Sequence, residues 1–188
     1  MENFKNQLKE ISHLSDDSLT DLLKICSLQN FKKNDFVLEY GKICQSMYFI
    51  SKGLLRIFYY KHDKEISEWF AFENTFCFSI ISYFKKTPSA LIIECLEDSE
   101  IITLSRDGLQ NLRNRNFEIA NFAYDLVAGS LIASQERMVS LLFETAQQRY
   151  DNLMKVHQNM LQRVPLQYIA SYLGVTAETL SRIRANHQ

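Results

Sequence analysis

The sequence predicts an α+β fold: an antiparallel β-roll or jelly-roll barrel flanked by helices, then a long helix, then a C-terminal helix-turn-helix domain. Three observations predict this order. Short aromatic and β-branched runs, separated by turn residues, fill residues 31–104. An apolar-periodic segment with one glycine and no proline spans residues 116–143. Residues 164–184 have the pattern of two short helices joined by a tight turn.

Residues 4–30 carry apolar side chains at helical spacing, which predicts packing helices. Polar residues at 13–17 interrupt this pattern, and Ser15 or Asp16 suits the N-cap of a second short helix. Beyond this segment the pattern changes to short strand-like runs, which cover residues 36–38, 47–50, 54–60, 65–72, 91–96 and 101–104. Their regular spacing predicts an antiparallel barrel or sandwich, whose interior should hold most of the aromatic residues.

The long periodic segment begins after a helix-capping sequence at residues 105–107 and carries two apolar stripes. The first alternates by three and four residues, like a coiled-coil seam, and consists of Tyr124, Val127, Leu131, Ser134, Met138 and Leu141. The second consists of Ile119, Phe122, Leu126, Gly129, Ala133 and Phe143. Two stripes predict two partners: the chain's own barrel and the same helix of a second copy. Burial of a single helix within a monomer is the alternative.

Residues 144–163 again carry apolar residues at helical spacing and predict one further helix. We therefore expect a barrel domain over residues 1–115, the long helix over residues 116–143 and a helix-turn-helix domain over residues 144–188. The joint between barrel and helix-turn-helix is expected near residues 142–145.

Residues 164–184 carry the most specific pattern in the chain. The positions that must be apolar to hold two such helices together are Ile169, Leu173, Val175, Leu180 and Ile183. Ala170 permits close approach of the helices, and Gly174 occupies the turn, where a positive φ is free only without a Cβ. Pro165 suits the first turn of one helix and Thr176 the N-cap of the next. The pattern predicts a DNA-reading module whose exposed face consists of Ala177, Glu178, Ser181, Arg182 and Ala185.

The charge balance agrees with a DNA-reading C-terminus. From Gln147 onward five basic and two acidic residues give a net charge of +3, so the preceding residues carry −4 of the total of −1. Positive charge confined to one end is compatible with phosphate contacts made by that end. The four cysteines form no CxxC pair, so we expect no metal site. No apolar leader and no run of membrane-spanning length stand out, so we expect a cytoplasmic protein with no membrane partner.

The order of these elements resembles that of the Crp/Fnr superfamily of bacterial transcription regulators. The most specific matching stretches are Met47-Tyr48-Phe49-Ile50-Ser51-Lys52-Gly53-Leu54-Leu55-Arg56 and residues 164–184. The resemblance implies a cyclic-nucleotide-binding-type barrel joined to a DNA-binding domain. It also implies a homodimer through the first stripe of the long helix, with each subunit placing a recognition helix in the major groove of double-stranded DNA. RNA polymerase is a candidate further partner.

Position by position, residues 176–182 match the recognition-helix core of that family. Glu178 and Arg182 fall on the base-reading positions, where Arg suits guanine O6 and N7 and Glu suits a cytosine amino group. A surface ion pair between the two is the alternative. Ala177 stands where relatives often carry Arg. The expected phosphate contacts are Thr176, Thr179, Ser181 and Arg184.

Two departures from the family pattern matter. The sequence ends at Gln188, so the closing β-wing of the family is expected to be absent or reduced. The family's phosphate cassette, a Gly-Glu pair followed by Arg-Ser, corresponds here to Phe78-Ser79 and Pro88-Ser89. Because a bulky Phe replaces Gly and no Arg remains, we expect neither cyclic-nucleotide binding nor a cofactor. The candidate effector pocket, lined by Phe78, Ser79, Ser82, Ser89 and Ala90, would hold another small ligand or be closed by aromatic side chains.

The leading hypothesis is a sequence-specific transcription regulator that acts as a homodimer, with the barrel coupled to the helix-turn-helix through the long helix. The alternative is a small-molecule-binding or protein-interaction module whose helix-turn-helix is structural. An iron–sulfur sensor would need clustered cysteines, and a haem sensor a placed axial ligand, whereas His62 falls in a polar turn. No Ser/His/Asp set, Cys/His set or Gly-rich phosphate loop is recognisable, so we expect no enzymatic activity.

Overall fold

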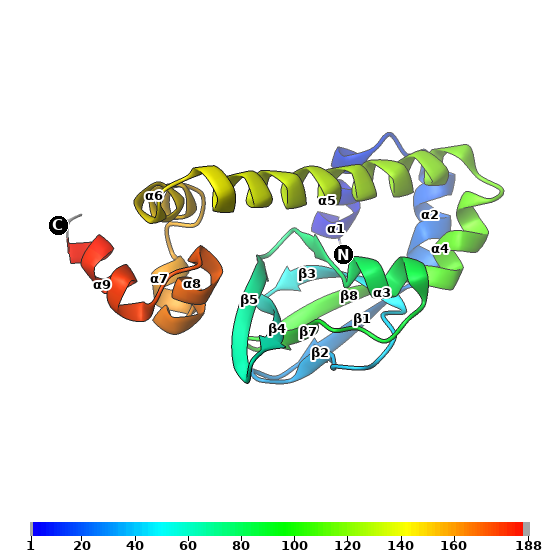
Figure 1. Cartoon of the computed structure of the whole chain (residues 1–188). Helices are drawn as coiled ribbons and strands as arrows, with labels where there is room; N and C mark the ends of the chain where they lie inside the picture. Colours follow the sequence, from blue (N-terminus) through cyan, green and yellow to red (C-terminus); the bar gives the residue numbers. More distant parts are fainter. Residues whose placement is uncertain (1, 186–188) are drawn as a thin grey trace. The chain divides into compact units, whose positions relative to one another are not determined.

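The computed structural model describes residues 2–185 (Figure 1). The chain folds into two compact units. Unit 1 comprises Met1–Ile57 and Phe70–Ser130, and unit 2 comprises Phe58–Trp69 and Leu131–Gln188. The hairpin over residues 58–69 therefore groups with the C-terminal helices by its contacts. The sequence pattern gives no reason to expect this grouping, because hairpin and helices are more than sixty residues apart.

Eight strands among the described residues form two four-stranded sheets, in the orders β1-β8-β3-β6 and β2-β7-β4-β5. The strands are β1 Cys26–Phe31, β2 Phe36–Leu38, β3 Ser46–Lys52, β4 Leu55–Lys61, β5 Lys64–Ala71, β6 Phe76–Cys77, β7 Ile92–Cys95 and β8 Ser99–Ser105. β1 and β3 both pair with β8 in antiparallel register, and β2 pairs with β7 in the same sense. The predicted antiparallel β-roll is confirmed.

The N-terminal helices are α1 Glu2–Ile11 and α2 Asp16–Lys24. Ser15 caps α2, since its Oγ accepts a hydrogen bond of 3.3 Å from the Ser18 N–H, as the break in the pattern predicted. The helical expectation is wrong from residue 26 onward. Residues 26–31 form β1 instead, because each of them pairs with a residue of β8 and this tertiary pairing overrides the local spacing.

Aromatic and aliphatic side chains fill the interior of the roll. Phe49 is fully buried, and its ring centroid lies 4.8 Å from that of Phe4 on α1 and 5.1 Å from that of Phe76. The expectation that aromatic residues fill the barrel holds for these residues. It fails for Phe36 and Tyr40, which are 51% and 67% exposed.

Two short helices flank the roll. α3 Ile80–Lys85 lies in a stretch that the sequence pattern left irregular. α4 Arg106–Arg113 begins at the predicted cap, where Ser105 Oγ accepts from the Gly108 N–H at 3.3 Å.

The long helix α5 spans Phe117–Phe143, as its periodicity predicted. By length and composition alone it could cross a membrane, so the expectation that no run reaches that length is wrong. The helix carries the charged residues Glu118, Asp125, Glu136 and Arg137. Such charges are costly inside a bilayer, which favours a helix that packs against protein.

Unit 2 contains the helices α6 Ala146–Val156, α7 Met160–Arg163, α8 Leu166–Leu173 and α9 Ala177–Ala185. α6 begins with a capping box formed by Thr145 and Gln148. The single helix predicted over residues 144–163 is therefore two, because the backbone leaves helical geometry at His157 with φ −126° and ψ 68°. The β4–β5 hairpin turns at His62 and Asp63, whose φ values of 49° and 59° are those of a two-residue type I′ turn.

Candidate nucleic-acid interface

The turn between α8 and α9 is closed by backbone hydrogen bonds. Gly174 has φ +69°, and its N–H donates to the Ser171 carbonyl at 3.1 Å. The next N–H, of Val175, donates to the Ala170 carbonyl at 3.0 Å, which satisfies the carbonyls at the end of α8. Thr176 Oγ1 accepts from the Thr179 N–H at 3.2 Å and so caps α9. The local geometry is that of a helix-turn-helix.

The inner sides of α8 and α9 are buried as the sequence pattern requires. Ile169 and Leu180 have no exposed surface, and Ala170, Leu173 and Ile183 are buried beside them. Val175, in the turn, is half-buried. Burial of these side chains fixes the angle between the two helices and leaves the other side of α9 in solvent.

The outer side of α9 is exposed and polar. Ala177, Glu178, Ser181, Arg182, Arg184 and Ala185 are all exposed. Within residues 2–185 neither Glu178 nor Arg182 forms an ion pair or a side-chain hydrogen bond, so the ion pair considered as the alternative is not formed there. Both side chains keep their hydrogen-bonding groups available, and their spacing of four places them on one helix face.

Arg149 of α6 holds the end of α8. Its Nε donates to the Leu173 carbonyl at 2.9 Å and its Nη1 to the Glu144 carbonyl at 2.6 Å. A guanidinium at this position satisfies a helix C-terminal carbonyl and complements the negative end of the helix dipole. Sequence reasoning counted Arg149 only as a charge, because nothing in a local pattern predicts a bond between residues 24 positions apart.

A second support joins Arg137 of α5 to Tyr172 of α8. Arg137 Nη2 donates to the Tyr172 carbonyl at 2.8 Å, and the guanidinium carbon lies 3.7 Å from the centroid of the Tyr172 ring. Burial lowers the pKa of Arg137, and the nearby Tyr172 and Glu68 oppose that shift. The cation therefore stays charged in a site with little water.

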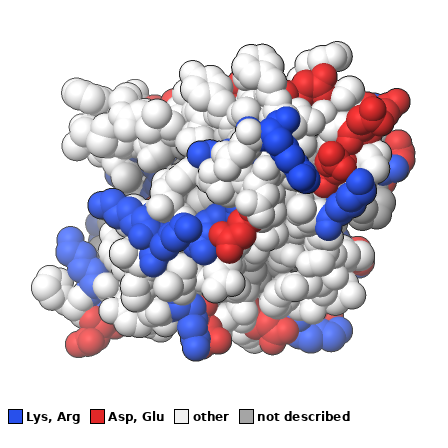
Figure 2. Space-filling model, turned by 90° about the vertical axis from the view of Figure 1, so that its right-hand side faces the viewer, with Lys and Arg blue, Asp and Glu red and all other residues white. Residues whose placement is uncertain are grey.

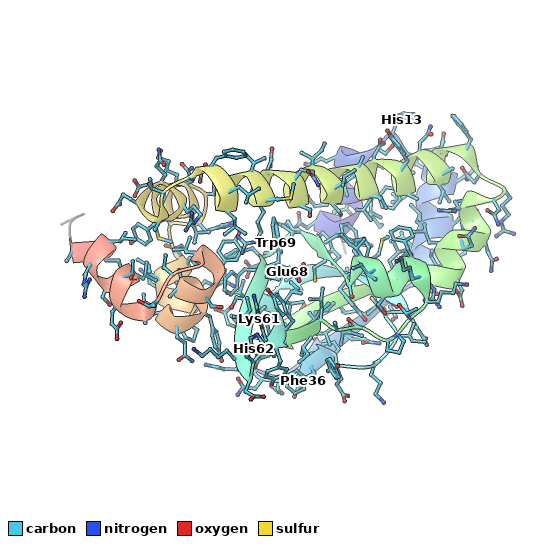
Figure 3. The ribbon with its side chains drawn as sticks, in the orientation of Figure 1. His13, Phe36, Lys61, His62, Glu68 and Trp69 are labelled. Atoms are coloured by element: carbon cyan, nitrogen blue, oxygen red, sulfur yellow. The ribbon has the colours of Figure 1, made fainter. Side chains whose placement is uncertain are left out.

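Strand β5 of the same unit also contacts α8. Ser171 Oγ accepts from the Ser67 N–H at 2.9 Å, and the Trp69 ring meets the Tyr172 ring edge to face at 6.5 Å. Figure 3 labels Glu68 and Trp69 near the end of β5, away from Lys61 and His62 at the hairpin turn. Burial raises the pKa of Glu68, and the charge of Arg137 lowers it. No local sequence pattern predicts these contacts.

The predicted effector-pocket residues are mostly buried, and their hydroxyl groups bond within the chain. Ser89 Oγ donates to Ser79 Oγ at 2.9 Å. Ser82 Oγ donates to the Thr87 carbonyl at 2.6 Å and accepts from the Cys44 N–H at 2.9 Å. Phe78 is buried against the rings of Tyr83 and Phe84, whereas Ala90 is exposed. The structure joins Ser79 and Ser89 by a hydrogen bond, whereas the Ser82 hydroxyl bonds to the backbone of Thr87 and Cys44.

The first stripe of α5 is exposed along most of its length. Tyr124 is 72% exposed and Leu131 58% exposed, and Ser134, Met138 and Leu141 are exposed with them, whereas Val127 is half-buried. In the second stripe Ile119, Phe122 and Leu126 are buried. Beyond Leu126 this stripe leaves the core, because Gly129 is exposed and Phe143 is 80% exposed.

The side chains that could bind a metal are dispersed in the part of the chain that the structure describes, where no three His, Cys, Asp or Glu residues gather. The four cysteines are free. Burial raises the pKa of Cys26 to about 12 and raises the pKa of Cys44, Cys77 and Cys95 as well. These thiols stay protonated and are poor nucleophiles. His62 is exposed in the hairpin turn.

The chain was compared with protein families, curated proteins and solved structures. Residues 28–116 match the family described as cyclic nucleotide-binding domain. A comparison of the sequence with curated proteins finds no significant match.

Among solved structures, FixK2 from Bradyrhizobium japonicum is similar with a TM-score of 0.75 and 18% identity, over 86% of this chain and 84% of that one. The catabolite activator protein of Thermus thermophilus is similar with a TM-score of 0.59 and 19% identity, over 96% and 85%. CLP of Xanthomonas campestris, described as a c-di-GMP responsive global regulator, has a TM-score of 0.68 and 14% identity, over 93% and 92%. The chain thus has the fold of these regulators, as its sequence pattern predicted, and residues 28–116 match the cyclic nucleotide-binding domain family.

Proposed function

We propose that the protein is a cytoplasmic transcription regulator that binds double-stranded DNA through α9 as a homodimer and has no enzymatic activity. The observation that carries the proposal is the geometry of α8 and α9, in which a capped helix presents Glu178 and Arg182 on an exposed face. The Crp/Fnr-like fold supports the same function. RNA polymerase is a candidate partner of the DNA-bound form.

Within this proposal, α9 is the recognition helix. Arg182 donates to guanine O6 and N7, and Glu178 accepts from a cytosine amino group. Thr176, Thr179, Ser181 and Arg184 contact phosphates, which orient the helix without reading sequence. The supports from Arg137 and Arg149 hold α8, and through it α9, in a defined orientation.

The homodimer would form along the exposed stripe of α5, from Tyr124 to Leu141. Apolar side chains repeated at intervals of three and four residues pack against the same helix of a second copy. A two-fold symmetric pair can place its recognition helices about 34 Å apart, as successive major grooves require. The exposure of Leu131 and Met138 supports this interface, because large apolar side chains in a row need a cover.

The proposal does not include cyclic nucleotides as effectors. In the stretch aligned with the family's phosphate cassette, Phe78 stands in place of Gly and is buried, and the serine hydroxyls bond within the chain, which supports this exclusion. An effector of another class would act through its different affinity for two arrangements of the dimer.

Mobility shift with a library of random-sequence DNA duplexes tests DNA binding. We expect Arg182→Ala to lose about 1–3 kcal/mol of binding free energy and to lose preference at one base pair in each half-site. Arg115→Ala, which removes an exposed Arg of unit 1, is the matched control and should bind like the wild type. Uniform weakening across all sequences would make Arg182 a phosphate contact. A wild-type protein that shifts no duplex at low salt would refute the proposed function.

A further inference from the structure

A small pocket in unit 1 lies where α3, α4 and α5 meet β3. It has a volume of about 100 Å³ and is lined by residues from all four elements, with Met47, Phe84, Leu109 and Val127 among the apolar ones. On this measure of volume about 10–15 Å³ is enough to admit one water molecule, so the pocket has room for a compact group of about five heavy atoms. None of the serines of the cassette lines this pocket, which therefore differs from the candidate effector pocket.

The polar lining is strongly basic. The lining contains three cations, Lys86, Arg106 and Arg113, and one acid, Asp107. Arg106 is half-buried, and its Nη1 donates to the Cys44 carbonyl at 3.1 Å while its Nε lies 3.3 Å from Asp107 Oδ1. These two bonds fix the guanidinium and neutralise Asp107. Figure 2 looks onto the α2 and α4 end, where Lys and Arg side chains gather near the middle of the face.

The remaining cations have no such partners. Arg113 and Lys86 make no ion pair and no side-chain hydrogen bond with any residue from 2 to 185. Arg106 and Arg113 lie on one face of α4 together with Gln110, at intervals of four and three residues. Two positive charges, those of Lys86 and Arg113, therefore line the pocket without a partner. The third, that of Arg106, is fixed by its two bonds.

The Tyr83 hydroxyl supplies a second observation. The residue is 5% exposed and lines the pocket, yet its hydroxyl has no hydrogen-bond partner among residues 2–185. Burial raises the pKa of Tyr83 to about 12, and the charges of Arg106 and Arg113 act in the opposite direction. The hydroxyl therefore lines the same pocket as Arg106 and Arg113 and is free to donate a hydrogen bond to a bound group.

We propose that this pocket binds the phosphate group of a small molecule, either free phosphate or a phosphate monoester. Lys86, Arg106, Arg113 and Asp107 together give the lining a charge of +2, which a doubly charged phosphate balances. The guanidinium groups and the Tyr83 hydroxyl present N–H and O–H donors to its oxygens. The apolar wall excludes water from one side of the group and strengthens these bonds. The site is independent of the proposed DNA binding.

Calorimetric titration of the full chain with inorganic phosphate, in the absence of DNA, tests the proposal. Arg113→Gln should weaken phosphate binding about tenfold, as the loss of one charged hydrogen bond implies. Tyr83→Phe, which removes only the hydroxyl, should weaken it in the same direction. Arg115→Gln is the matched control, because Arg115 is exposed and does not line the pocket. It should bind phosphate like the wild type.

Further titrations distinguish the ligands. If methyl phosphate binds more tightly than inorganic phosphate, the site is assigned to a phosphate monoester. If inorganic phosphate binds more tightly, the site is assigned to free phosphate. Acetate that binds more tightly than both would overturn the phosphate assignment. Equal phosphate affinity of the wild type, Arg113→Gln and Tyr83→Phe, each shown to be folded by circular dichroism, would overturn the site. DNA binding in mobility shift would be unaffected by that result, so the two proposals fail separately.

Discussion

Single side chains connect distant parts of unit 1, and Glu118 is the clearest case. Its Oε2 accepts hydrogen bonds from the Ser15 N–H at 2.9 Å, from Ser15 Oγ at 2.6 Å and from Ser18 Oγ at 2.5 Å. The carboxylate of α5 thus sits at the N-terminus of α2, where the helix dipole favours negative charge. These hydrogen bonds lower the pKa of Glu118 from its ordinary value of 4.5 to about 2.

This pKa shift predicts how stability changes in acid. Because the folded-state pKa is lowered, the stabilisation is fully present above pH about 4.5 and is lost as the pH falls through about 2. The melting temperature of Glu118→Gln should therefore fall less steeply than that of the wild type between these pH values. Glu136→Gln is the control, since this exposed carboxylate of α5 makes no hydrogen bond within residues 2–185. Parallel curves for all three proteins would contradict the prediction.

Arg149 donates hydrogen bonds to the carbonyl of Leu173 at the end of α8 and to the carbonyl of Glu144. Replacement by Met keeps the aliphatic stem but leaves the Leu173 and Glu144 carbonyls without this donor. We expect a loss of about 1–3 kcal/mol in the free energy of unfolding of unit 2, because both lost bonds are to a charged donor. Urea denaturation followed by far-ultraviolet circular dichroism measures it. Lys155→Met, an exposed substitution on the same helix, should change little, and an equal effect of both would refute the role of Arg149.

At the scale of elements, Gly174 decides whether α8 can turn into α9. Its φ of +69° lies in the left-handed region, so Gly174→Ala should destabilise the protein by about 1–2 kcal/mol through backbone strain. Gly129 gives the contrasting case, because it is helical and a Cβ there would meet nothing within 4 Å. Gly129→Ala should stabilise α5 by about 0.5–1 kcal/mol. Thermal unfolding at one protein concentration compares the two, and a neutral Gly174→Ala would show that the turn is not strained.

The elements also show what the sequence could and could not predict. Strong local patterns predicted α2 with its Ser15 cap and α5 over its full length. They also predicted α8 and α9 with Gly174 between them. β1 was missed because residues 26–31 become a strand only by pairing with β8, which lies some seventy residues further along the chain. The break at His157 was missed because no Gly or Pro marks it.

The candidate nucleic-acid interface likewise has a part that the sequence predicted and a part that it did not. The exposed face of α9 was predicted residue by residue, since period 3.6 alone separates Arg182 from Ile183. The residues that hold this face in place were not, because Arg137 and Arg149 act through bonds to backbone carbonyls of α8. Similarly, the basic pocket of unit 1 combines Tyr83 of α3 with Arg113 of α4, which only the tertiary fold brings together. Local sequence patterns therefore predict which side chains of α9 are exposed, but not the tertiary contacts that hold the helix in place.

For the molecule as a whole, the decisive question is whether the exposed stripe of α5 joins two copies. Leu131 lies near the middle of that stripe and is 58% exposed. Leu131→Glu would place a carboxylate opposite its own symmetry mate, and two buried like charges are strongly unfavourable. We expect this variant to sediment as a monomer in analytical ultracentrifugation while its circular dichroism spectrum stays that of the wild type.

The same variant links assembly to DNA binding. A monomer engages one half-site only, so Leu131→Glu should lose most of its affinity for a two-half-site duplex while it keeps its weaker affinity for a single half-site. Glu136→Lys changes charge on the opposite side of α5, half a turn from the stripe, and should remain dimeric with unchanged binding. If Leu131→Glu stays dimeric, the stripe is not the interface. If it becomes monomeric and still binds the full duplex with wild-type affinity, the two recognition helices do not act as a symmetric pair.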